Sequence, residues 1–376
     1  MARILHFADL HLDRSFASLR MAPSEASKRR VELRAALRRI VDLALELNVD
    51  ALTIGGDLYE HERVTLDTGN FIKQQLEQLA PRPVLIAPGN HDPYLPDALY
   101  RQIDWPANVR IFDSMHWQPV EIGDGVTIWG VGHTGPAIRE NLLRELRVGP
   151  GEAAVALLHG SDLTAVPEGK ATHCPFERQD AEACGTAFVL LGHYHDLRLW
   201  PDESPRLGYP GSPEPLDFGE AGPHFVLLLN VTKSSTSAQP LQINEVSYRQ
   251  EQIDIAGMTT SDQVRQAIVA RAHGEEQSRD IVRVELVGQA EPEIQVDVQA
   301  LLSGTAERFR YLDIVDKTLS AFDIDSLRDE TTTRGAFVRK IEERVASATT
   351  DEERQRLENA LRYGLQAFAG QEVRRR

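Results

Sequence analysis

The sequence predicts a layered α/β protein in which two packed sheets are flanked by helices, followed by a small α/β domain and C-terminal helices. Three observations support this prediction. Short apolar runs alternate with segments of helical periodicity over the first hundred residues, and closely spaced strands follow from about residue 109. A second alternation of strands and helices begins after about residue 240. We therefore expect domains at 1–240, 241–320 and 321–376.

Five short apolar runs organise the first domain, and each ends in residues that bind divalent metals. Runs of this length that are apolar almost throughout are typical of strands buried on both faces. In open α/β sheets ligands collect beyond the carboxyl ends of the strands, so the polar residues that close the runs are expected to converge on one cleft. The runs span 3–11, 51–57, 84–92, 155–160 and 188–195. The closing residues are Asp9, His11, Asp57, Asn90, His91, His159, His193 and His195.

Segments of helical periodicity separate these runs. A helix is expected over 27–47, where apolar residues recur near helical spacing, and others over 66–79, 96–103 and 138–146. The alternation of strand and helix predicts right-handed crossovers. The closely spaced strands from about residue 109 predict a second, partly antiparallel sheet packed on the first.

Two polar segments interrupt the pattern of strands and helices. Residues 161–185 are predicted to form a long loop, and loops of that length are uncommon in compact domains, which makes it a candidate functional segment. The stretch 233–240 is predicted to be a hairpin loop or a boundary near the second domain.

The rest of the chain carries none of the candidate ligands. Its expected elements are strands at 242–255, 281–287 and 309–316 and helices at 261–273 and 296–303. Residues 325–371 alternate charged and apolar residues at helical spacing, which predicts two amphipathic helices with a break near 348–352. Their apolar stripes are expected to pack on the small domain or on a partner's helix.

Composition limits the class of protein. The net charge of −16 over 376 residues argues against a protein that coats nucleic acid through a broad positive field. No stretch approaches roughly 18 uninterrupted apolar residues, so no membrane span is expected. The first strand begins without a signal peptide, and Cys174 and Cys184 are too few for a disulfide framework. We expect a cytoplasmic protein with reduced thiols.

Basic residues gather in one stretch beside the first run. Two interpretations stay open: the stretch holds a phosphate backbone near the cleft, or it is a solvated helix face balanced by acidic residues. Its members are Arg14, Arg20, Lys28, Arg29, Arg30, Arg34, Arg38 and Arg39.

The closing residues have the spacing of metal ligands. In a strand, residues two apart point to one side, so Asp9 with His11, and His193 with His195, can each present a pair of side chains to one cleft. Asp57 follows two glycines that let the backbone turn sharply. Seven nitrogen and oxygen ligands are too many for one tetrahedral zinc ion but suit two ions about 3.5 to 4 Å apart.

A two-ion site of this kind activates water and clamps phosphate oxygens during in-line displacement. His91 is left over as a candidate general acid for the leaving oxygen, and Asp92 is the neighbour expected to orient its ring and keep it protonated. The other histidines considered are expected to be structural, since a lone buried histidine is usually a satisfied core residue. They are His6, His116, His133, His224 and His273.

The set of motifs resembles the calcineurin-like metallophosphoesterases. The residues that carry the resemblance are Asp9 and His11, GlyAsp at 56–57, GlyAsnHisAsp at 89–92, HisGly at 159–160 and GlyHisTyrHis at 192–195. Within that superfamily, GlyAspLeuTyr, GlyAsnHisAspProTyr and the segment 209–220 are similar to the SbcD-like DNA repair exonucleases, particularly the YhaO-like branch. The resemblance covers about residues 1–232 and is only architectural afterwards.

The resemblance implies a metallophosphoesterase core and a division of the ligands. Asp9, His11, Asp57 and His195 would bind one ion, and Asp57, Asn90, His159 and His193 the other, with His91 as the catalytic acid. It also implies manganese, a DNA-contacting cap domain at about 241–318 and C-terminal helices that dock on the coiled coil of an SMC-like ATPase. A homodimer through the helices at 66–79 and 96–103 is implied as well.

One residue departs from the family pattern. Many relatives have histidine three residues after the bridging aspartate, where this chain has Glu60, so the balance of exonuclease and endonuclease activity is not implied. Two other functions remain open besides a two-metal DNA nuclease: a phosphatase or phosphodiesterase on small substrates, and an interaction scaffold with a secondary metal site.

Overall fold

The computed structural model describes residues 1–19, 21–272, 280–291, 296–320, 324–348 and 350–368. The chain forms two compact units, Met1–Arg249 and Gln250–Arg376. Arg20 and His273, which the sequence analysis singled out, lie outside the described residues. The division into domains at 1–240, 241–320 and 321–376 stays a prediction.

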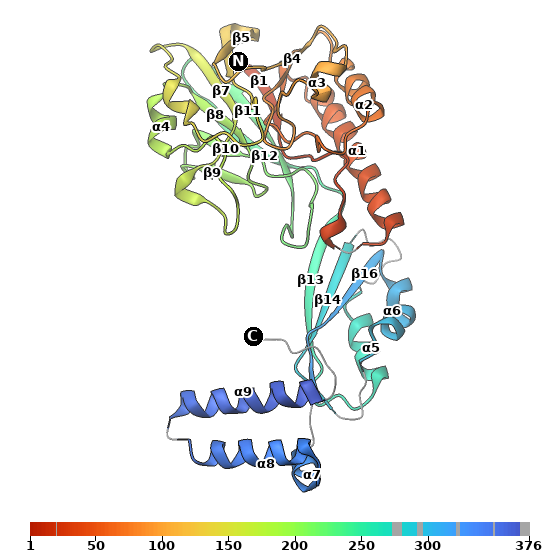
Figure 1. Cartoon of the computed structure of the whole chain (residues 1–376). Helices are drawn as coiled ribbons and strands as arrows, with labels where there is room; N and C mark the ends of the chain where they lie inside the picture. The colour runs from red at the N-terminus through yellow and green to blue at the C-terminus, as the bar shows by residue number, and fades with distance from the viewer. Residues whose placement is uncertain (20, 273–279, 292–295, 321–323, 349, 369–376) are drawn as a thin grey trace. The chain divides into compact units, whose positions relative to one another are not determined.

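The first sheet of unit 1 contains three of the five apolar runs (Figure 1). Four parallel strands, β1 to β4, lie side by side. Beyond β1 the sheet is extended by β11, which is antiparallel to β1, and by β12, which is antiparallel to β11. In spatial order they are β12 (Thr236–Gln242), β11 (Phe225–Val231), β1 (Ala2–Phe7), β2 (Ala51–Ile54), β3 (Val84–Ile86) and β4 (Val109–Ile111). The stretch predicted as a hairpin loop at 233–240 therefore contains the start of a strand as well as the turn.

The second sheet contains the other two runs. Its central strands are parallel, and its two edge strands are antiparallel, as the close spacing of the strands predicted. In spatial order they are β5 (Gln118–Ile122), β6 (Val126–Gly130), β7 (Ala153–His159), β8 (Phe188–Gly192), β10 (Leu207–Tyr209) and β9 (Arg198–Trp200). The strand at 109–111, expected in this sheet, instead extends the first sheet through its pairing with β3.

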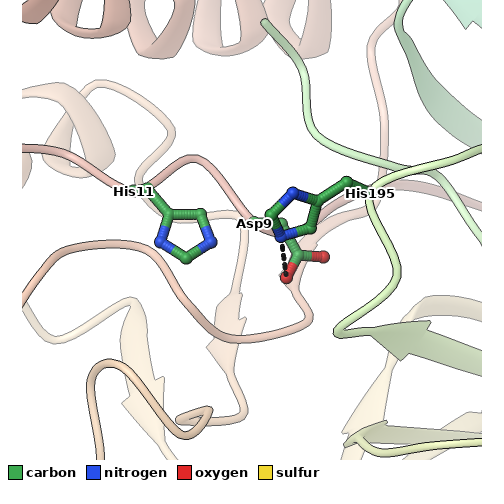
Figure 2. A group of neighbouring side chains, drawn as sticks. All are labelled: Asp9, His11 and His195. Atoms are coloured by element: carbon green, nitrogen blue, oxygen red, sulfur yellow. Dashed lines mark ion pairs between the residues drawn. The ribbon is translucent and has the colours of Figure 1, made fainter. Parts of the chain in front are cut away.

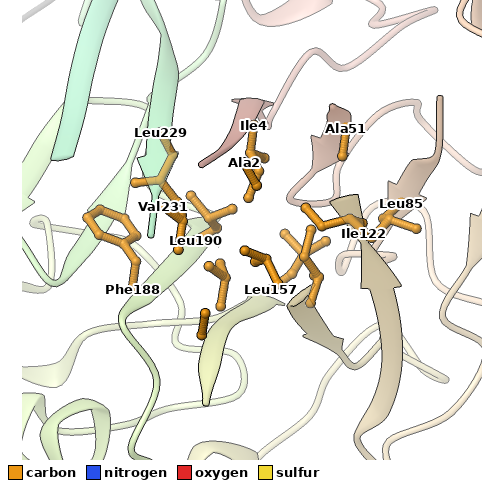
Figure 3. Close-up of a cluster of buried hydrophobic side chains, with 14 of the residues drawn as sticks. Ala2, Ile4, Ala51, Leu85, Ile122, Leu157, Phe188, Leu190, Leu229 and Val231 are labelled. Carbon is orange, nitrogen blue, oxygen red and sulfur yellow. The ribbon is translucent and has the colours of Figure 1, made fainter. Parts of the chain in front are cut away.

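The two sheets pack face to face through a shared apolar core (Figure 3). Ile4 and Leu229 from the first sheet meet Leu157 and Leu190 from the second, and all four side chains are fully buried. Burying apolar surface contributes roughly 25 cal/mol per Å², so this core is the main stabilising contact between the sheets. It confirms the predicted architecture of two packed sheets.

Helices cover the outer face of each sheet in unit 1. Beside the first sheet are α1 (Pro23–Glu46), α2 (Leu66–Glu77) and α3 (Leu99–Gln102) (Figure 1). Outside the second sheet, a second apolar cluster includes residues of α4 (Arg178–Ala183) and of the 3-10 helix Leu142–Glu145. Further 3-10 turns are Ala17–Leu19, Gly123–Gly125 and Leu163–Ala165.

Local sequence explains where these helices begin. Proline at the first position starts α1, four residues earlier than predicted, since its fixed φ suits the first turn of a helix. The Thr65 side chain accepts a hydrogen bond from the Thr68 amide and caps α2. The helix predicted over 138–146 is wrong, because only the 3-10 helix forms there.

Unit 2 has a three-stranded sheet and two helices that share one apolar core. In spatial order the strands are β13 (Ser247–Asp254), β14 (Asp280–Val287) and β16 (Tyr311–Asp316), and the helices are α5 (Ser261–Val269) and α6 (Val298–Thr305). Short strands β15 (Gln289–Ala290) and β17 (Leu319–Ser320) pair in parallel, and Ala306–Arg308 is a 3-10 helix. The capping box of Thr260 and Gln263 starts α5.

The C-terminal part of unit 2 is helical as predicted, but α7 is a third helix in addition to the two expected. It comprises α7 (Ile324–Asp329), α8 (Thr333–Ala346) and α9 (Asp351–Phe368). The break between α8 and α9 falls where the sequence predicted it, near 348–352. Leu327, Val338 and Leu365 form the buried core of this group.

The basic stretch along α1 is largely neutralised by acidic partners in unit 1. Arg29 is fully buried and binds Glu32 and the Pro215 carbonyl, while Arg39 pairs with the buried Glu214. Arg34 pairs with Asp67, Lys28 with Glu25, and Arg14 with Asp217. For these five residues the contacts favour a helix face balanced by acidic partners, the second of the two interpretations.

No helix within the described ranges is long and apolar enough to cross a membrane.

Gly192 and Gly55 set how closely the carboxyl ends of the two sheets approach. A Cβ on Gly192 would lie 2.1 Å from the Gly55 carbonyl oxygen, which is backbone and cannot give way. Gly192→Ala is expected to lower the free energy of unfolding by about 1–3 kcal/mol, the usual cost of overpacking, in urea denaturation of the full chain. Gly135→Ala is the matched control, since its Cβ would meet nothing within 4 Å. Equal stability of the two variants would contradict this close approach.

Candidate metal centre

The pairing registers bring the ends of the five runs to one place. Phe7 pairs with Ile54 and Ile54 with Ile86, so the first three runs end at the same edge of the first sheet. In the second sheet His159 pairs with Gly192, which puts His159 beside His193. The predicted convergence therefore occurs where the edges of two sheets meet, rather than at the edge of one.

The backbone leaves the strands in an unusual conformation at four of the predicted ligands. Asp9, His11, Asp57 and His193 have φ values of 56°, 50°, 51° and 110°. Positive φ is uncommon for residues other than glycine and persists only when the surrounding structure imposes it. Hydrogen bonds between the turns do so here: the Asp9 amide donates to the Gly56 carbonyl, and the His11 amide to the Asp57 carbonyl.

Asp9, His11 and His195 form the first ligand cluster (Figure 2). One ligand atom from each lies within 4.8 Å of the others. His195 Nε2 is 3.9 Å from Asp9 Oδ1, and both Asp9 oxygens accept the His193 amide at 3.0 and 3.1 Å. The cluster thus joins the end of β1 to the segment after β8.

Asp57, His159 and His193 form the second cluster, with the same spread of ligand atoms. Asp57 Oδ2 lies 3.4 Å from His159 Nε2 and 3.7 Å from His11 Nε2, so this carboxylate lies between the two clusters. The Asn90 amide oxygen is 3.0 Å from His159 Nε2. The structure therefore brings all seven predicted metal ligands together, and a third group of potential ligands, His11, Asp57 and His91, overlaps both clusters.

Each of the four ligand histidines donates one ring N–H away from the cluster. His159 Nδ1 donates to the Gly55 carbonyl at 2.8 Å, and His193 Nε2 to the Ala171 carbonyl at 2.9 Å. His11 Nδ1 donates to Glu60 at 2.9 Å, and His195 Nδ1 to Glu220 at 2.6 Å. The other nitrogen of each ring keeps its lone pair for a metal, an arrangement that fixes the tautomer and raises ligand basicity.

The donor set fits two divalent cations. His11 Nε2 is buried and has no hydrogen-bond partner, although burial usually requires one. His159 Nε2 and the Asn90 oxygen face each other at 3.0 Å as two acceptors, since the His159 proton is on Nδ1. Burial lowers the pKa of His11 and His193 to about 3 and that of His159 well below its ordinary value, so the rings are neutral ligands.

The two carboxyl groups are poor anions without a cation beside them. Burial raises the pKa of Asp9 to about 7, and burial likewise raises the pKa of Asp57 to about 7. Bound divalent ions favour the charged form of both groups. Asp9, Asp57, His11, His159, His193, His195 and Asn90 are thus the residues that would hold the metals.

His91 is held by Glu60, not by Asp92. Its Nδ1 donates to Glu60 Oε2 at 2.9 Å, so this bond engages Nδ1 and not Nε2, and 43% of the side chain is exposed. Burial lowers the pKa of His91, but the bond to Glu60 and the charges of Asp57 and Glu60 outweigh it and raise the pKa to about 9. Glu60 accepts from His11 as well, and although burial opposes ionisation, these two bonds lower its pKa.

Asp92 is a positioning residue for two ligand turns. Its Oδ1 accepts the Asp57 and Gly89 amides at 3.0 and 2.6 Å. Its Oδ2 accepts the Leu58 amide at 2.8 Å and the Tyr100 hydroxyl at 2.6 Å. These four bonds leave no direct hydrogen bond from Asp92 to the His91 ring, which corrects the orienting role expected from their adjacency. The charge of Asp92 contributes only a smaller upward shift to the pKa of His91.

Sequence reasoning missed the roles of Glu60 and Glu220. Glu60 was noted only as a departure from the family pattern. Glu220 lies in the motif at 209–220 but had no assigned role. Burial raises its pKa, yet hydrogen bonds from His195, Leu216 and Ser212 outweigh this and lower it to about 2. Nothing in the local sequence signals that this carboxylate pairs with a histidine 25 residues earlier.

The four described histidines that were expected to be structural lie outside the ligand clusters. His6 binds Thr53 and the Leu191 carbonyl through its two ring nitrogens, which confirms a core role. His133 Nε2 donates to the His159 carbonyl, behind the second cluster. His224 binds the carbonyls of Ser212 and Glu220, and His116 is exposed.

Comparisons with known proteins agree with this site. The profile of the calcineurin-like phosphoesterases matches residues 2–197. The chain is 29% identical over 261 residues to the uncharacterized metallophosphoesterase YhaO of Bacillus subtilis, covering 67% of this chain and 62% of that protein. It is 24% identical over 273 residues to the DNA double-strand break repair protein Mre11 of Haloferax volcanii, covering 71% and 58%. The chain thus spans about three fifths of the length of these relatives.

A solved structure is also similar. The crystal structure of TT1561 of Thermus thermophilus covers 64% of this chain and 98% of its own, with 14% identity and a TM-score of 0.37.

The position of Asp57 between the clusters predicts how metal content responds to substitution. Asp57→Ala is expected to weaken the binding of both ions. His195→Ala is expected to weaken the binding of only the ion at the first cluster, because His195 belongs to that cluster alone. Equilibrium dialysis against the same free manganese concentration for every variant, followed by elemental analysis, measures this as ions bound per chain. We expect two for the native chain and for the control His116→Ala, about one for His195→Ala and fewer than one for Asp57→Ala. Undiminished binding by Asp57→Ala would contradict the shared position.

Proposed function

The chain belongs to the calcineurin-like phosphoesterase family, and we propose that it is a two-metal phosphodiesterase that cuts DNA as an exonuclease or endonuclease. One observation carries the proposal: Asp57 of the second cluster lies 3.7 Å from His11 of the first, and the exposed His91 forms a further group of potential ligands with these two residues. A pair of ions with a proton donor at its edge is an arrangement that stabilises in-line phosphoester cleavage.

The ligands determine what the metals can do. When bound, two divalent ions act as Lewis acids that activate water and neutralise phosphate oxygens. The carboxylates of Asp9 and Asp57 would hold the ions, while Glu60, Glu220 and two backbone carbonyls keep the imidazole rings in place. Mixed imidazole and carboxylate ligands suit manganese, iron, cobalt and zinc, and we propose manganese from the family resemblance.

His91 is proposed to protonate the leaving oxygen. Glu60 holds its Nδ1, so the proton to be transferred is on Nε2, and the carboxylate stabilises the imidazolium before transfer. Glu60 also holds His11, a ligand of the first cluster. The Glu60 carboxylate therefore sets the position of His91 relative to the metal ligands, which favours proton transfer from His91 to the leaving oxygen.

DNA as the substrate is proposed from two kinds of similarity. The motifs resemble those of SbcD-like exonucleases, and the chain is 24% identical to a protein named for DNA double-strand break repair. The same resemblance supports a cytoplasmic role in DNA repair or processing, with a cap domain at about 241–318 that contacts DNA. Phosphodiester cleavage of small substrates is the alternative outcome that the assay below separates.

A partner and a dimer are proposed on the same basis. The helices α8 and α9 bury only a small apolar core of their own, and Phe368 at the end of α9 is 46% exposed. We propose that this segment docks on the coiled coil of an SMC-like ATPase. A homodimer through α2 and α3 is proposed from the family resemblance, and Leu66 at the start of α2 is 55% exposed.

The substrate class is tested by incubating the manganese-loaded full chain with double-stranded and single-stranded DNA, nitrophenyl phosphate and cyclic nucleotides. We expect DNA to be degraded, and we expect chelation of the metal or Asp57→Ala to abolish cleavage by removing ions from the site. His116→Ala serves as the control that keeps activity. Intact DNA beside rapid turnover of a small ester would reject the nuclease and support the alternative.

The proton donor is tested by changing the leaving group. Without His91, an alkoxide must leave unprotonated, so His91→Ala is expected to slow cleavage of an alkyl or nucleotide ester by roughly 10²–10⁴-fold. A nitrophenyl diester, whose leaving group is stable as an anion, should be slowed far less. Glu60→Gln should show the same dependence more weakly. Equal losses on both esters would show that His91 does not supply the proton.

A further inference from the structure

The segment 161–185, predicted as a long functional loop, contains α4 and a 3-10 helix, and its part before α4 is ordered by its own hydrogen bonds. Its base is closed by the bridge between Asp162 and Phe176, where the Leu163 amide donates to the Phe176 carbonyl at 2.9 Å and the Phe176 amide to the Ser161 carbonyl at 3.0 Å. The Asp162 carboxylate caps the 3-10 helix that follows and accepts from Arg178. The loop thus has compact, closed ends, as in surface loops that carry function.

The far side of this loop is attached to the metal centre. The ring of His193, a ligand of the second cluster, donates to the Ala171 carbonyl at 2.9 Å. His173 and Ser161 bind each other through two hydrogen bonds, of 2.9 and 3.0 Å. Between these anchors and the base, Gly169 adopts a φ of +73°, and the Lys170 amide donates to the Pro167 carbonyl. The turn at 167–170 is therefore fixed relative to the ligands.

This turn presents one cation to the site. Lys170 is half-buried, and its Nζ lies 3.3 Å from Nε2 of His195, the nitrogen that faces the first cluster. Its charge also acts on the second cluster: burial is the largest cause of the lowered pKa of His193, and Lys170 adds to it. Among the residues that the structure describes, Lys170 forms no ion pair with a carboxylate.

We infer that Lys170 binds a non-bridging oxygen of the phosphate that is held at the metal centre, an inference that rests on the proposed phosphodiesterase function. When His195 Nε2 gives its lone pair to a metal, it no longer accepts from Lys170. The ammonium group, still placed by the loop, then needs another acceptor. A phosphate oxygen bound at the same cluster is an anion within reach, and charge-assisted hydrogen bonds of this kind are the strong ones.

The inference makes the loop part of substrate recognition. Asp9, Asp57 and the ligand imidazoles bind cations and offer nothing to an anion. Lys170 is the group on this loop whose charge complements phosphate, so it contributes affinity for any phosphoester and no preference among bases.

The test uses inorganic phosphate as the probe and the full manganese-loaded chain. Lys170→Met removes the charge and keeps much of the length, while Lys170→Arg keeps the charge. Lys233→Met is the matched control: Lys233 lies two residues after Val231, which pairs with Ala2 at the amino end of β1, opposite the site. Calorimetric titration gives the dissociation constant for phosphate, and elemental analysis gives the manganese content of each variant.

We expect Lys170→Met to weaken phosphate binding by about tenfold or more, since hydrogen bonds to charged groups contribute roughly 1.5–3 kcal/mol. Lys170→Arg and Lys233→Met should stay within about threefold of the native chain, with two manganese ions bound in every variant.

Three results would overturn the inference: no phosphate binding by the native chain, native affinity in Lys170→Met, or an affinity that falls only in step with manganese content. The last would assign Lys170 to holding His195. If Lys170→Met loses phosphate affinity while native protein leaves DNA intact, the inference stands and the proposed nuclease function fails.

Discussion

Burial of two carboxyl groups is the constraint on which the first unit depends. Asp9 and Asp57 are 0% and 2% exposed, in a region where burial disfavours their charged forms. Imidazole lone pairs, rather than N–H groups, are turned toward them. Burying carboxylates and acceptor nitrogens that face one another raises the free energy of the folded state unless cations bind between them. The free energy of metal binding therefore also contributes to the stability of this fold.

The main architecture could be predicted because the apolar runs are short, continuous and closed by glycine or proline. The sequence did not show that the runs divide between two sheets, since periodicity within a strand carries no information about its neighbours. The contact between Gly55 and Gly192 that joins the sheet edges depends on tertiary packing. The helix predicted over 138–146 was wrong because the conformation of its apolar residues also depends on tertiary packing. Leu142 and Leu143 are buried in a 3-10 helix that packs in one apolar cluster with α4.

The ligands could be predicted from residue type and position, whereas the groups that hold them could not. A histidine or aspartate at the end of a buried strand can be recognised from the sequence alone. Glu60 and Glu220 act through hydrogen bonds that span 49 and 25 residues, and sequence alone does not reveal them. The prediction that Asp92 orients the His91 ring was wrong although the two residues are neighbours in sequence, because the side chain of Asp92 binds backbone amides and that of His91 binds Glu60.

The bonding of Asp92 has a consequence for interpreting genetic data. Its carboxylate accepts the amides of Asp57 and Leu58 in the turn after β2 and the amide of Gly89 in the turn after β3. These bonds hold the two turns in a fixed position relative to each other. An inactive allele at this codon would reflect a displaced scaffold rather than a lost chemical step. In a mutational screen it would be indistinguishable from a true reaction participant, and only structural data on the variant would tell the two apart.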